Sequence, residues 1–514
     1  VDGKPTLAPG SDHRCCSQAA SRCGANLLSG LRRGWLHVAG GGAVGRIAGF
    51  ASNLALTRLL GPADLGLFSL VTQTIQLADT MASAGADYAV NYELGATVAP
   101  LETRRGQRLI QALGQLSVLM TLVFMVGLAL WLGPWQGLFP QGLSAISRGF
   151  YIGLLMALVA LEGLASAPWE SLLVSRQTKK FAWRQGVFLP LRMLFAALGA
   201  FIAAVPGAMV GWLLAALIQA LWLGWIVGPL LNPGVLWRSW SSRQYHVILL
   251  LLKRGWPFFA NTFLGSLIFY PLILQVAVQG GVGEVGYFRV GQIVQQLFAF
   301  LPATLSPLLL LHLRSEEGLR RRVQVVERPL ALLWVLMLFT FFLYLSFDHW
   351  LVVSLFGSSY MAAILPTRVL LLTALIESLL QLYGQPLLAS GWMVGYFRLL
   401  TCVGFVAAAW GWWMIPAYGL GGYLLARLVY VFMPLMVCLR LLILEGLDPY
   451  PLLLPGALTV VSLLVCFCQL LLPGSGLVLV GSSEPMMALL ACVVLLMSIS
   501  QQDRRFLFSL IRNR

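Results

Sequence analysis

Long apolar segments recur along almost the whole chain and decide its fold class. Each is about 18 to 25 residues long, which is the length a helix needs to cross ~30 Å of hydrocarbon at about 1.5 Å per residue. The pattern predicts an all-α polytopic membrane protein with about fourteen transmembrane helices. The expected spans are 36–59, 66–90, 109–132, 150–173, 186–204, 208–231, 256–279, 285–311, 329–347, 362–389, 396–414, 419–440, 452–473 and 486–500.

The positive charges lie mostly on one side of this topology. The chain carries 34 Lys and Arg residues and a net charge of +15. Most of them fall in alternate loops and at the two termini, so the positive-inside rule predicts that both termini are cytoplasmic. Topology accounts for the basic balance, and no nucleic-acid partner is expected. The exceptions are Arg46, Arg58, Arg148, Arg192, Arg289, Arg368 and Arg427.

Composition excludes several other classes of protein. Hydrophobic residues make up 59% of the chain and charged residues only 10%, against about 45–50% and 25% in soluble domains. Cys15, Cys16 and Cys23 lie too close together, with too few further ligands, to frame a zinc site. We therefore expect no metal, no cofactor and no disulfide framework.

Three segments recur in order along the chain and indicate a duplication. Residues 60–68 and 280–288 share an order of Gly, acid, Gly and aromatic residue at an offset of 220. The segment that begins at Pro206 resembles the one that begins at Pro416, at an offset of 210. Glu162 and Glu377 match at an offset of 215.

The duplication predicts two pseudo-symmetric six-helix lobes related by an axis along the membrane normal, with a cavity between them. Two further helices follow the second lobe. The expected division of the chain is a disordered cytoplasmic N-terminus (1–35), an N-lobe (36–231), an interfacial cytoplasmic linker (232–255), a C-lobe (256–441), and spans thirteen and fourteen with a basic cytoplasmic tail (442–514).

The repeated segments also carry a family resemblance. Residues 58–70, the stretch from Val285 to Pro307 and the segments around 355–363 and 388–391 resemble the Wzx-type polysaccharide-biosynthesis flippases. These belong to the multidrug/oligosaccharidyl-lipid/polysaccharide (MOP) exporter superfamily. The resemblance covers roughly residues 36–440 and rests on distributed Gly, Pro and aromatic positions, with no catalytic motif.

The resemblance implies a two-lobed flippase of the plasma (inner) membrane. It would carry an isoprenoid-pyrophosphate-linked oligosaccharide of the undecaprenyl type from the inner to the outer leaflet by alternating access, for surface polysaccharide such as lipopolysaccharide. Its implied partners are membrane lipids, a polysaccharide polymerase and glycosyltransferases.

Cationic residues inside the lobes are the first candidates for contact with such a head group. An Arg at the bilayer centre costs about 2.5–3.5 kcal/mol on insertion scales, so it should face the interior and have a partner or a function. A guanidinium fork also matches phosphate oxygens. The candidates are Arg46, Arg192, Arg289 and Arg427, although each could instead pair with an acid and hold helices together.

Intramembrane acids and amides are the second set of candidates. Asp79, Glu162 and Glu377 could couple transport to an ion or contact the glycan, and helix cohesion is the alternative. Gln73 and Gln292 are expected to contact glycan hydroxyls.

The sequence is also compatible with other functions. A lipid II flippase and a multidrug and toxin extrusion antiporter share the same lobed plan. An enzyme, a polysaccharide polymerase or ligase, is disfavoured because the expected outward loops are short and no phosphate-binding loop or metal-ligand cluster occurs. We therefore expect no catalytic residues.

Overall fold

A computed structural model describes residues 44–86, 104–130, 145–174, 178–227, 242–299 and 318–447, with a few isolated positions outside these ranges. A first helix covers 44–59. The helices that follow are α2 (Pro62–Ser83), α4 (Arg104–Leu130), α6 (Ala145–Val174), α7 (Thr178–Trp183), the π-helix η2 (Arg184–Phe188), α8 (Leu189–Val227), α10 (Ser242–Gln279), α11 (Val282–Phe298), α13 (Leu319–Phe356), the 3-10 helix η3 (Ser358–Ala363), α14 (Ile364–Ala389), α15 (Met393–Tyr418) and α16 (Leu420–Leu444).

These helices confirm the predicted fold class of an all-α polytopic membrane protein. Every expected span from 36–59 to 419–440 overlaps a described helix, and no strand occurs among the described residues. Seven of the described helical segments are long and apolar enough to cross a membrane. Of the last two expected spans, 452–473 is described only at 456 and 459–462, and 486–500 lies outside the described residues.

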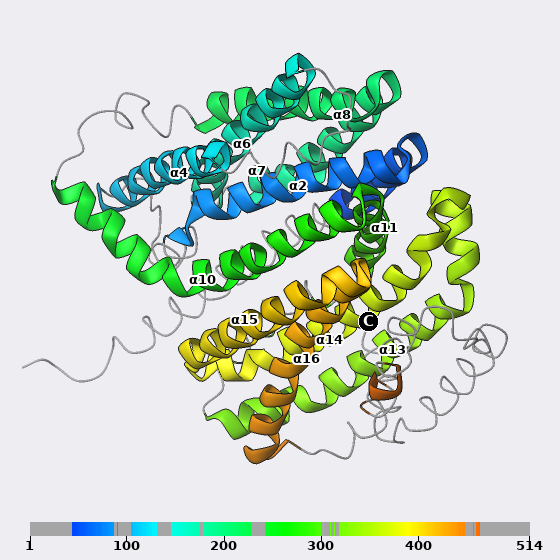
Figure 1. The fold of residues 1–514 in the computed structure, drawn as a ribbon. Helices are drawn as coiled ribbons and strands as arrows, with labels where there is room; N and C mark the ends of the chain where they lie inside the picture. The colour runs from blue at the N-terminus through cyan, green and yellow to red at the C-terminus, as the bar shows by residue number, and fades with distance from the viewer. Residues whose placement is uncertain are drawn as a thin grey trace, which may run out of the picture.

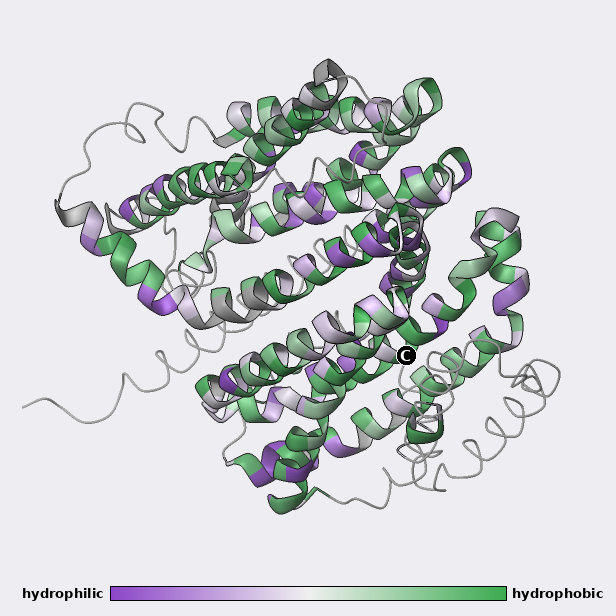
Figure 2. Ribbon diagram, in the orientation of Figure 1, coloured by the Kyte–Doolittle hydropathy of each residue, from purple (hydrophilic) through white to green (hydrophobic). Residues whose placement is uncertain are grey.

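The helices form two groups with α10 and α11 between them (Figure 1). In the N-lobe, α6 packs against α2, α4 and α8. In the C-lobe, α14 packs against α13 and α16, and α16 also packs against α15. Helix α11 bridges the groups because it contacts both α2 and α14. Figure 2 shows hydrophilic residues on α11 and on the middle of α2, between the two groups.

The first predicted repeat coincides with the crossing of α2 and α11. A Cβ added at Gly66 would lie 2.9 Å from the Val282 carbonyl carbon, and one added at Gly286 would lie 2.8 Å from the Pro62 carbonyl carbon. The two pairs are related by the same offset of 220, so the pseudo-symmetry axis passes through this crossing. Only glycine permits backbones to approach so closely.

The later repeats share a turn with an unusual backbone. Ala204 has φ 46° and ψ −130° at the kink inside α8, and Gly419 has φ 53° and ψ −129° between α15 and α16. The offset is 215, as for Glu162 and Glu377. The sequence match of Pro206 with Pro416 is therefore wrong by five residues, because proline can be placed at several positions near such a turn, whereas the left-handed residue fixes the register.

Both ends of α2 contact the other half of the molecule. We name the ends of the bundle after the predicted topology: the turns at 60–61, 203–204, 280–281 and 418–419 lie at the outer end, and the opposite end is the inner end. At the outer end, α2 crosses α11, and Tyr360 donates to the Leu60 carbonyl oxygen at 2.7 Å. Arg58 also donates to the carbonyl oxygens of Ser354 and Leu355.

At the inner end, Gly85 faces Gly255 of α10. A Cβ at Gly85 would lie 2.9 Å from the Phe259 backbone nitrogen, and one at Gly255 would lie 2.6 Å from the Gly85 carbonyl carbon. Leu109 and Leu113 of α4 pack with Ile248 and Leu251 of α10 in one apolar cluster beside this contact. The two groups of helices therefore touch at both ends of α2.

The predicted domain boundaries fall partly on residues outside the description. These are 1–43, 228–241 and most of 448–514. Within the described part, α10 runs from Ser242 to Gln279 without interruption. Residues 242–255 of the expected linker are thus continuous with the seventh span.

Candidate functional site

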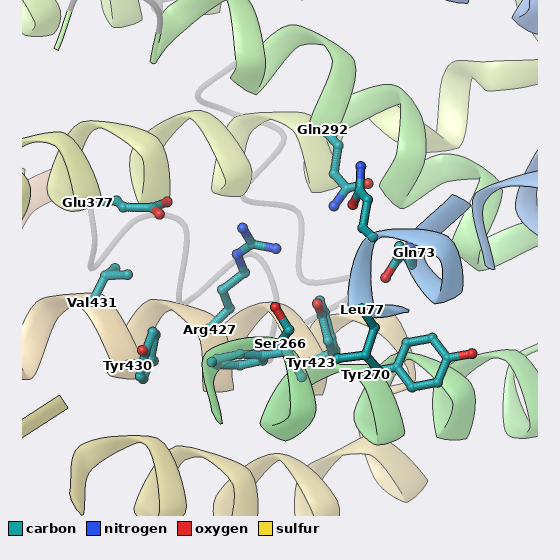
Figure 3. A pocket seen from close by; sticks show the side chains of 13 residues that line it. Gln73, Leu77, Ser266, Tyr270, Gln292, Glu377, Tyr423, Arg427, Tyr430 and Val431 are labelled. Carbon is teal, nitrogen blue, oxygen red and sulfur yellow. The ribbon is translucent and has the colours of Figure 1, made fainter. Parts of the chain in front are cut away.

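A polar cavity lies between the two groups of helices, midway between the two ends of α2. It consists of three compartments of about 330, 530 and 200 Å³. The first two share Gln292, Glu377 and Arg427, and the last two share Arg46, Leu189 and Gln296, so the compartments adjoin one another. Figure 3 shows the first compartment, with side chains from α2, α10, α11, α14 and α16 around it.

Helical spacing places these polar side chains on one face of each helix. On α14, Glu377 and Gln381 are exposed, whereas 369–376 and 378–380 are buried. Residues four apart lie on the same side of a helix. Gln73 and Gln76 of α2 line the cavity in the same way. The cavity wall is therefore built from narrow polar stripes on otherwise apolar helices.

Arg289 is the most deeply buried cation of the cavity wall, with a relative exposure of 5%. Its Nη2 donates to Asn53 Oδ1 at 3.3 Å and its Nη1 to Gln292 Oε1 at 3.5 Å, while Nε has no hydrogen-bond partner. No acidic side chain lies within ion-pair distance of it among the described residues. A buried charge normally requires a counter-charge, so this guanidinium retains capacity for an anion.

Arg46 and Arg427 line the same cavity from other helices. Arg46 comes from the first helix, and Arg427 comes from α16. Arg427 lies over the Phe288 ring, 5.9 Å from its centroid, and interacts with the Tyr423 hydroxyl. With Arg289 they place three guanidinium groups around a cavity whose lining, among the residues that the structure describes, includes one carboxylate, that of Glu377.

Arg192 and Glu162 occupy a different position. Arg192 Nη1 lies 2.9 Å from Glu162 Oε1, and the two side chains are 13% and 7% exposed. Arg192 Nη2 also donates to Gln219 Oε1 at 2.5 Å, and Trp212 Nε1 donates to Glu162 Oε1 at 3.2 Å. These groups pair with one another inside the N-lobe, with Arg192 Nε left without a hydrogen-bond partner, and the pairing matches the helix-cohesion alternative for both residues.

Asp79 is paired as well. Its carboxylate lies 3.3 Å from Arg184 Nη2 of the π-helix, and the two side chains are 39% and 29% exposed. Of the three acids expected to couple an ion, only Glu377 lines the cavity. No group of three or more metal-binding side chains occurs in the part of the chain that the structure describes.

The structure thus brings together most of the predicted site residues and adds others. Arg46, Arg289, Arg427, Gln73, Gln292 and Glu377 meet at the cavity. Sequence reasoning missed Asn53, which holds Arg289, and the aromatic residues Tyr423 and Tyr430. The two tyrosines stand four residues before and three after Arg427, a spacing that places them on its face of the helix.

Neither the comparison with protein-family models nor that with curated sequences gives a match. Solved structures do match. The lipid II flippase MurJ in an inward closed conformation has a TM-score of 0.64 at 12% identity, over 88% of this chain and 96% of that one. An inward-facing multidrug resistance MATE transporter of the MOP superfamily gives 0.56 at 14% identity, over 78% and 94%.

A MOP superfamily transporter from Pyrococcus furiosus, described as having a binding pocket of reverse polarity, gives a TM-score of 0.52 at 14% identity, over 80% of this chain and 95% of that one. All these proteins are transporters or flippases. At such identities the likeness concerns the fold alone. The chain is a multi-pass membrane protein with the fold of MOP superfamily transporters.

Proposed function

We propose that this protein flips isoprenoid-pyrophosphate-linked oligosaccharides from the inner to the outer leaflet, by alternating access, for surface polysaccharide biosynthesis. The observation that carries the proposal is Arg289, a buried guanidinium that lines the cavity and contacts only neutral side chains in the described structure. A pyrophosphate supplies the missing negative charge.

The charge balance of the cavity supports an anionic head group. In the described part of the lining, three arginines (Arg46, Arg289 and Arg427) face one carboxylate, that of Glu377. Lipophilic cations, which a multidrug antiporter would export, meet net repulsion in such a space. The amides of Gln73 and Gln292 offer donors and acceptors for sugar hydroxyls.

The size of the cavity fits part of a head group. Ligand pockets commonly enclose about 300–1,000 Å³, and the largest compartment here is about 530 Å³. This volume accommodates a pyrophosphate with its nearest sugars, whereas a long isoprenoid tail must remain in lipid. The contacts at the two ends of α2 would then open in turn while the head group stays shielded.

A lipid II flippase is the second candidate. The MurJ structure shares the fold over 88% of this chain, and lipid II also presents a pyrophosphate and sugars on an isoprenoid tail. The two candidates agree on the role of the arginines and differ in the glycan. A polysaccharide polymerase and glycosyltransferases would be the partners in the first case only.

Transport by purified protein in liposomes tests the proposal. A short-chain prenyl-pyrophosphoryl oligosaccharide is placed in both leaflets, and the fraction accessible to an external glycosidase is followed over time. Wild-type protein should expose the inner pool, and Arg289→Gln should slow this at least tenfold. Arg398→Gln, which removes an exposed positive charge at the inner end of α15, should retain the wild-type rate.

Equal rates for Arg289→Gln and Arg398→Gln would contradict the proposed role of Arg289. If wild-type protein moves the prenyl-pyrophosphoryl disaccharide-pentapeptide of lipid II and not the oligosaccharide, the second candidate replaces the first.

A further inference from the structure

The two lobes use one pair of equivalent positions in opposite ways. The offset of 215 relates Glu162 to Glu377 and Trp212 to Arg427. In the N-lobe, Trp212 Nε1 donates to Glu162 Oε1 at 3.2 Å, and Arg192 completes an ion pair with the same oxygen at 2.9 Å. In the N-lobe, Glu162 and Trp212 therefore contact each other directly and are buried.

In the C-lobe, the equivalent pair opens into the cavity. Glu377 is exposed among buried neighbours on α14, and it shares the lining of two compartments with Arg427. The two side chains do not come within ion-pair distance of each other in the described structure. Figure 3 shows the carboxylate and the guanidinium directed toward the same open space.

The surroundings of Glu377 are rich in neutral polar groups. Gln295 Nε2 lies 3.5 Å from Glu377 Oε2, a long contact that leaves most of the carboxylate's acceptor capacity unused. Ser378 and Gln381 line the same compartment, and Tyr430 lines the neighbouring one. Carboxylates, amides and an aromatic ring together suit a ligand with several hydroxyl donors on a partly apolar ring.

We propose that the space between Glu377 and Arg427 is the subsite for the sugar attached directly to the pyrophosphate. Glu377 accepts hydrogen bonds from hydroxyls of this sugar, while Arg427 donates to the adjacent phosphate. Glu377 is then a specificity-determining residue that distinguishes a glycosylated carrier lipid from the bare carrier. This inference rests on the proposed function and adds the position of the first sugar.

The preference for the glycosylated lipid over the bare carrier depends on whether the Glu377 carboxylate has a hydrogen-bond donor in the complex. A site built to hydrogen-bond a hydroxyl penalises a ligand that lacks it, because a carboxylate that the bound lipid covers then loses water without gaining a partner. Hydrogen bonds to charged groups correspond to a preference of about 10- to 100-fold. The lipid that has been emptied of its glycan would bind correspondingly less well, which favours its release.

Binding of two matched lipids to the full-length protein in nanodiscs tests this. The probes are farnesyl pyrophosphate and farnesyl pyrophosphate that carries a single hexose on its terminal phosphate. The wild type should bind the hexose-bearing lipid about 10- to 100-fold more tightly. Glu377→Gln and Glu377→Ala should reduce this preference to less than threefold and leave the affinity for farnesyl pyrophosphate unchanged or higher.

Two control variants remove a carboxylate elsewhere. Glu445→Gln removes an exposed charge at the inner end of α16, and Glu162→Gln changes the equivalent position of the N-lobe. Folded samples of both should keep the wild-type preference, and Glu445→Gln suffices if Glu162→Gln does not fold.

The outcomes separate the two proposals. If the wild type binds neither lipid, the proposed function fails. If it binds both equally, or if both Glu377 variants keep the preference, the sugar subsite is overturned while the pyrophosphate site stands. If the wild type binds tetraphenylphosphonium more tightly than either lipid and Glu377→Gln abolishes that binding, the position is a cation site and the sugar subsite is likewise overturned.

Discussion

Replacement of Gly66 by alanine should open the outer end of the molecule. A Cβ at this position would lie 2.9 Å from the Val282 carbonyl carbon, whereas ordinary van der Waals contact begins at 3.4 Å. The obstacle is backbone on a neighbouring helix, so α2 and α11 must move apart by about half an ångström or more. Overpacking of this kind costs about 1–3 kcal/mol.

That cost falls only on the state in which α2 and α11 cross closely. A conformation with the outer end open does not contain the contact, so its population relative to the closed state should rise by about 5- to 150-fold, at 1.4 kcal/mol for each factor of ten. Spin labels at two exposed positions, Ala63 on α2 and Ser359 on η3, which packs against α11, report this as growth of a longer distance in the label-to-label distribution.

Gly61→Ala is the matched control, because a Cβ there meets nothing within 4 Å. Gly286→Ala, the pseudo-symmetric change, should act like Gly66→Ala. If Gly66→Ala gives the same distance distribution as Gly61→Ala, or a shorter distance, the close contact of α2 with α11 does not hold the outer end closed.

Two further changes test the packing of the N-lobe. Ala204→Gly should raise the midpoint of thermal unfolding, because glycine removes a backbone strain of about 1–3 kcal/mol at φ 46°. Ala203→Gly, where φ is −145°, should not raise it, and equal effects of the two changes would show that Ala204 is not strained. Arg192→Met should lower the free energy of unfolding by about 3–5 kcal/mol, because it leaves the Glu162 carboxylate buried without its counter-charge. The double variant Arg192→Met with Glu162→Gln should recover part of the lost thermal stability. A single variant as stable as the wild type would show that the ion pair does not stabilise the N-lobe.

The fold could be predicted from the sequence because the features that determine it recur along the chain. Apolar segments of spanning length, separated by short turns, leave few alternatives to transmembrane helices. The glycines at 66 and 286 stood at equivalent places in a recognisable repeat, and the structure confirms their equivalence at the crossing of α2 and α11. The later repeat was misaligned because its determinant is a backbone angle at Ala204, and alanine carries no sequence signal for that angle.

The sequence predicted most of the residues that line the site, but not which side chains contact one another. A buried arginine must face the interior, which selected Arg46, Arg192, Arg289 and Arg427 alike. Whether a buried arginine faces an acid depends on how two neighbouring helices are rotated against each other. The sequence around Arg192 therefore does not show that Glu162 of α6 lies beside it. Tyr423 and Tyr430 were missed because an aromatic residue in an apolar span has the same pattern whether it faces lipid, core or cavity.

The most direct measurement is a cryo-electron microscopy structure of the full chain in nanodiscs that contain a prenyl-pyrophosphoryl oligosaccharide. We expect density for the pyrophosphate between the lobes, within hydrogen-bond distance of Arg289 or Arg427, with the lipid tail leaving the helices toward the bilayer. Head-group density that lies outside the cavity lined by these arginines, with the cavity itself unchanged by the lipid, would rule out this binding site.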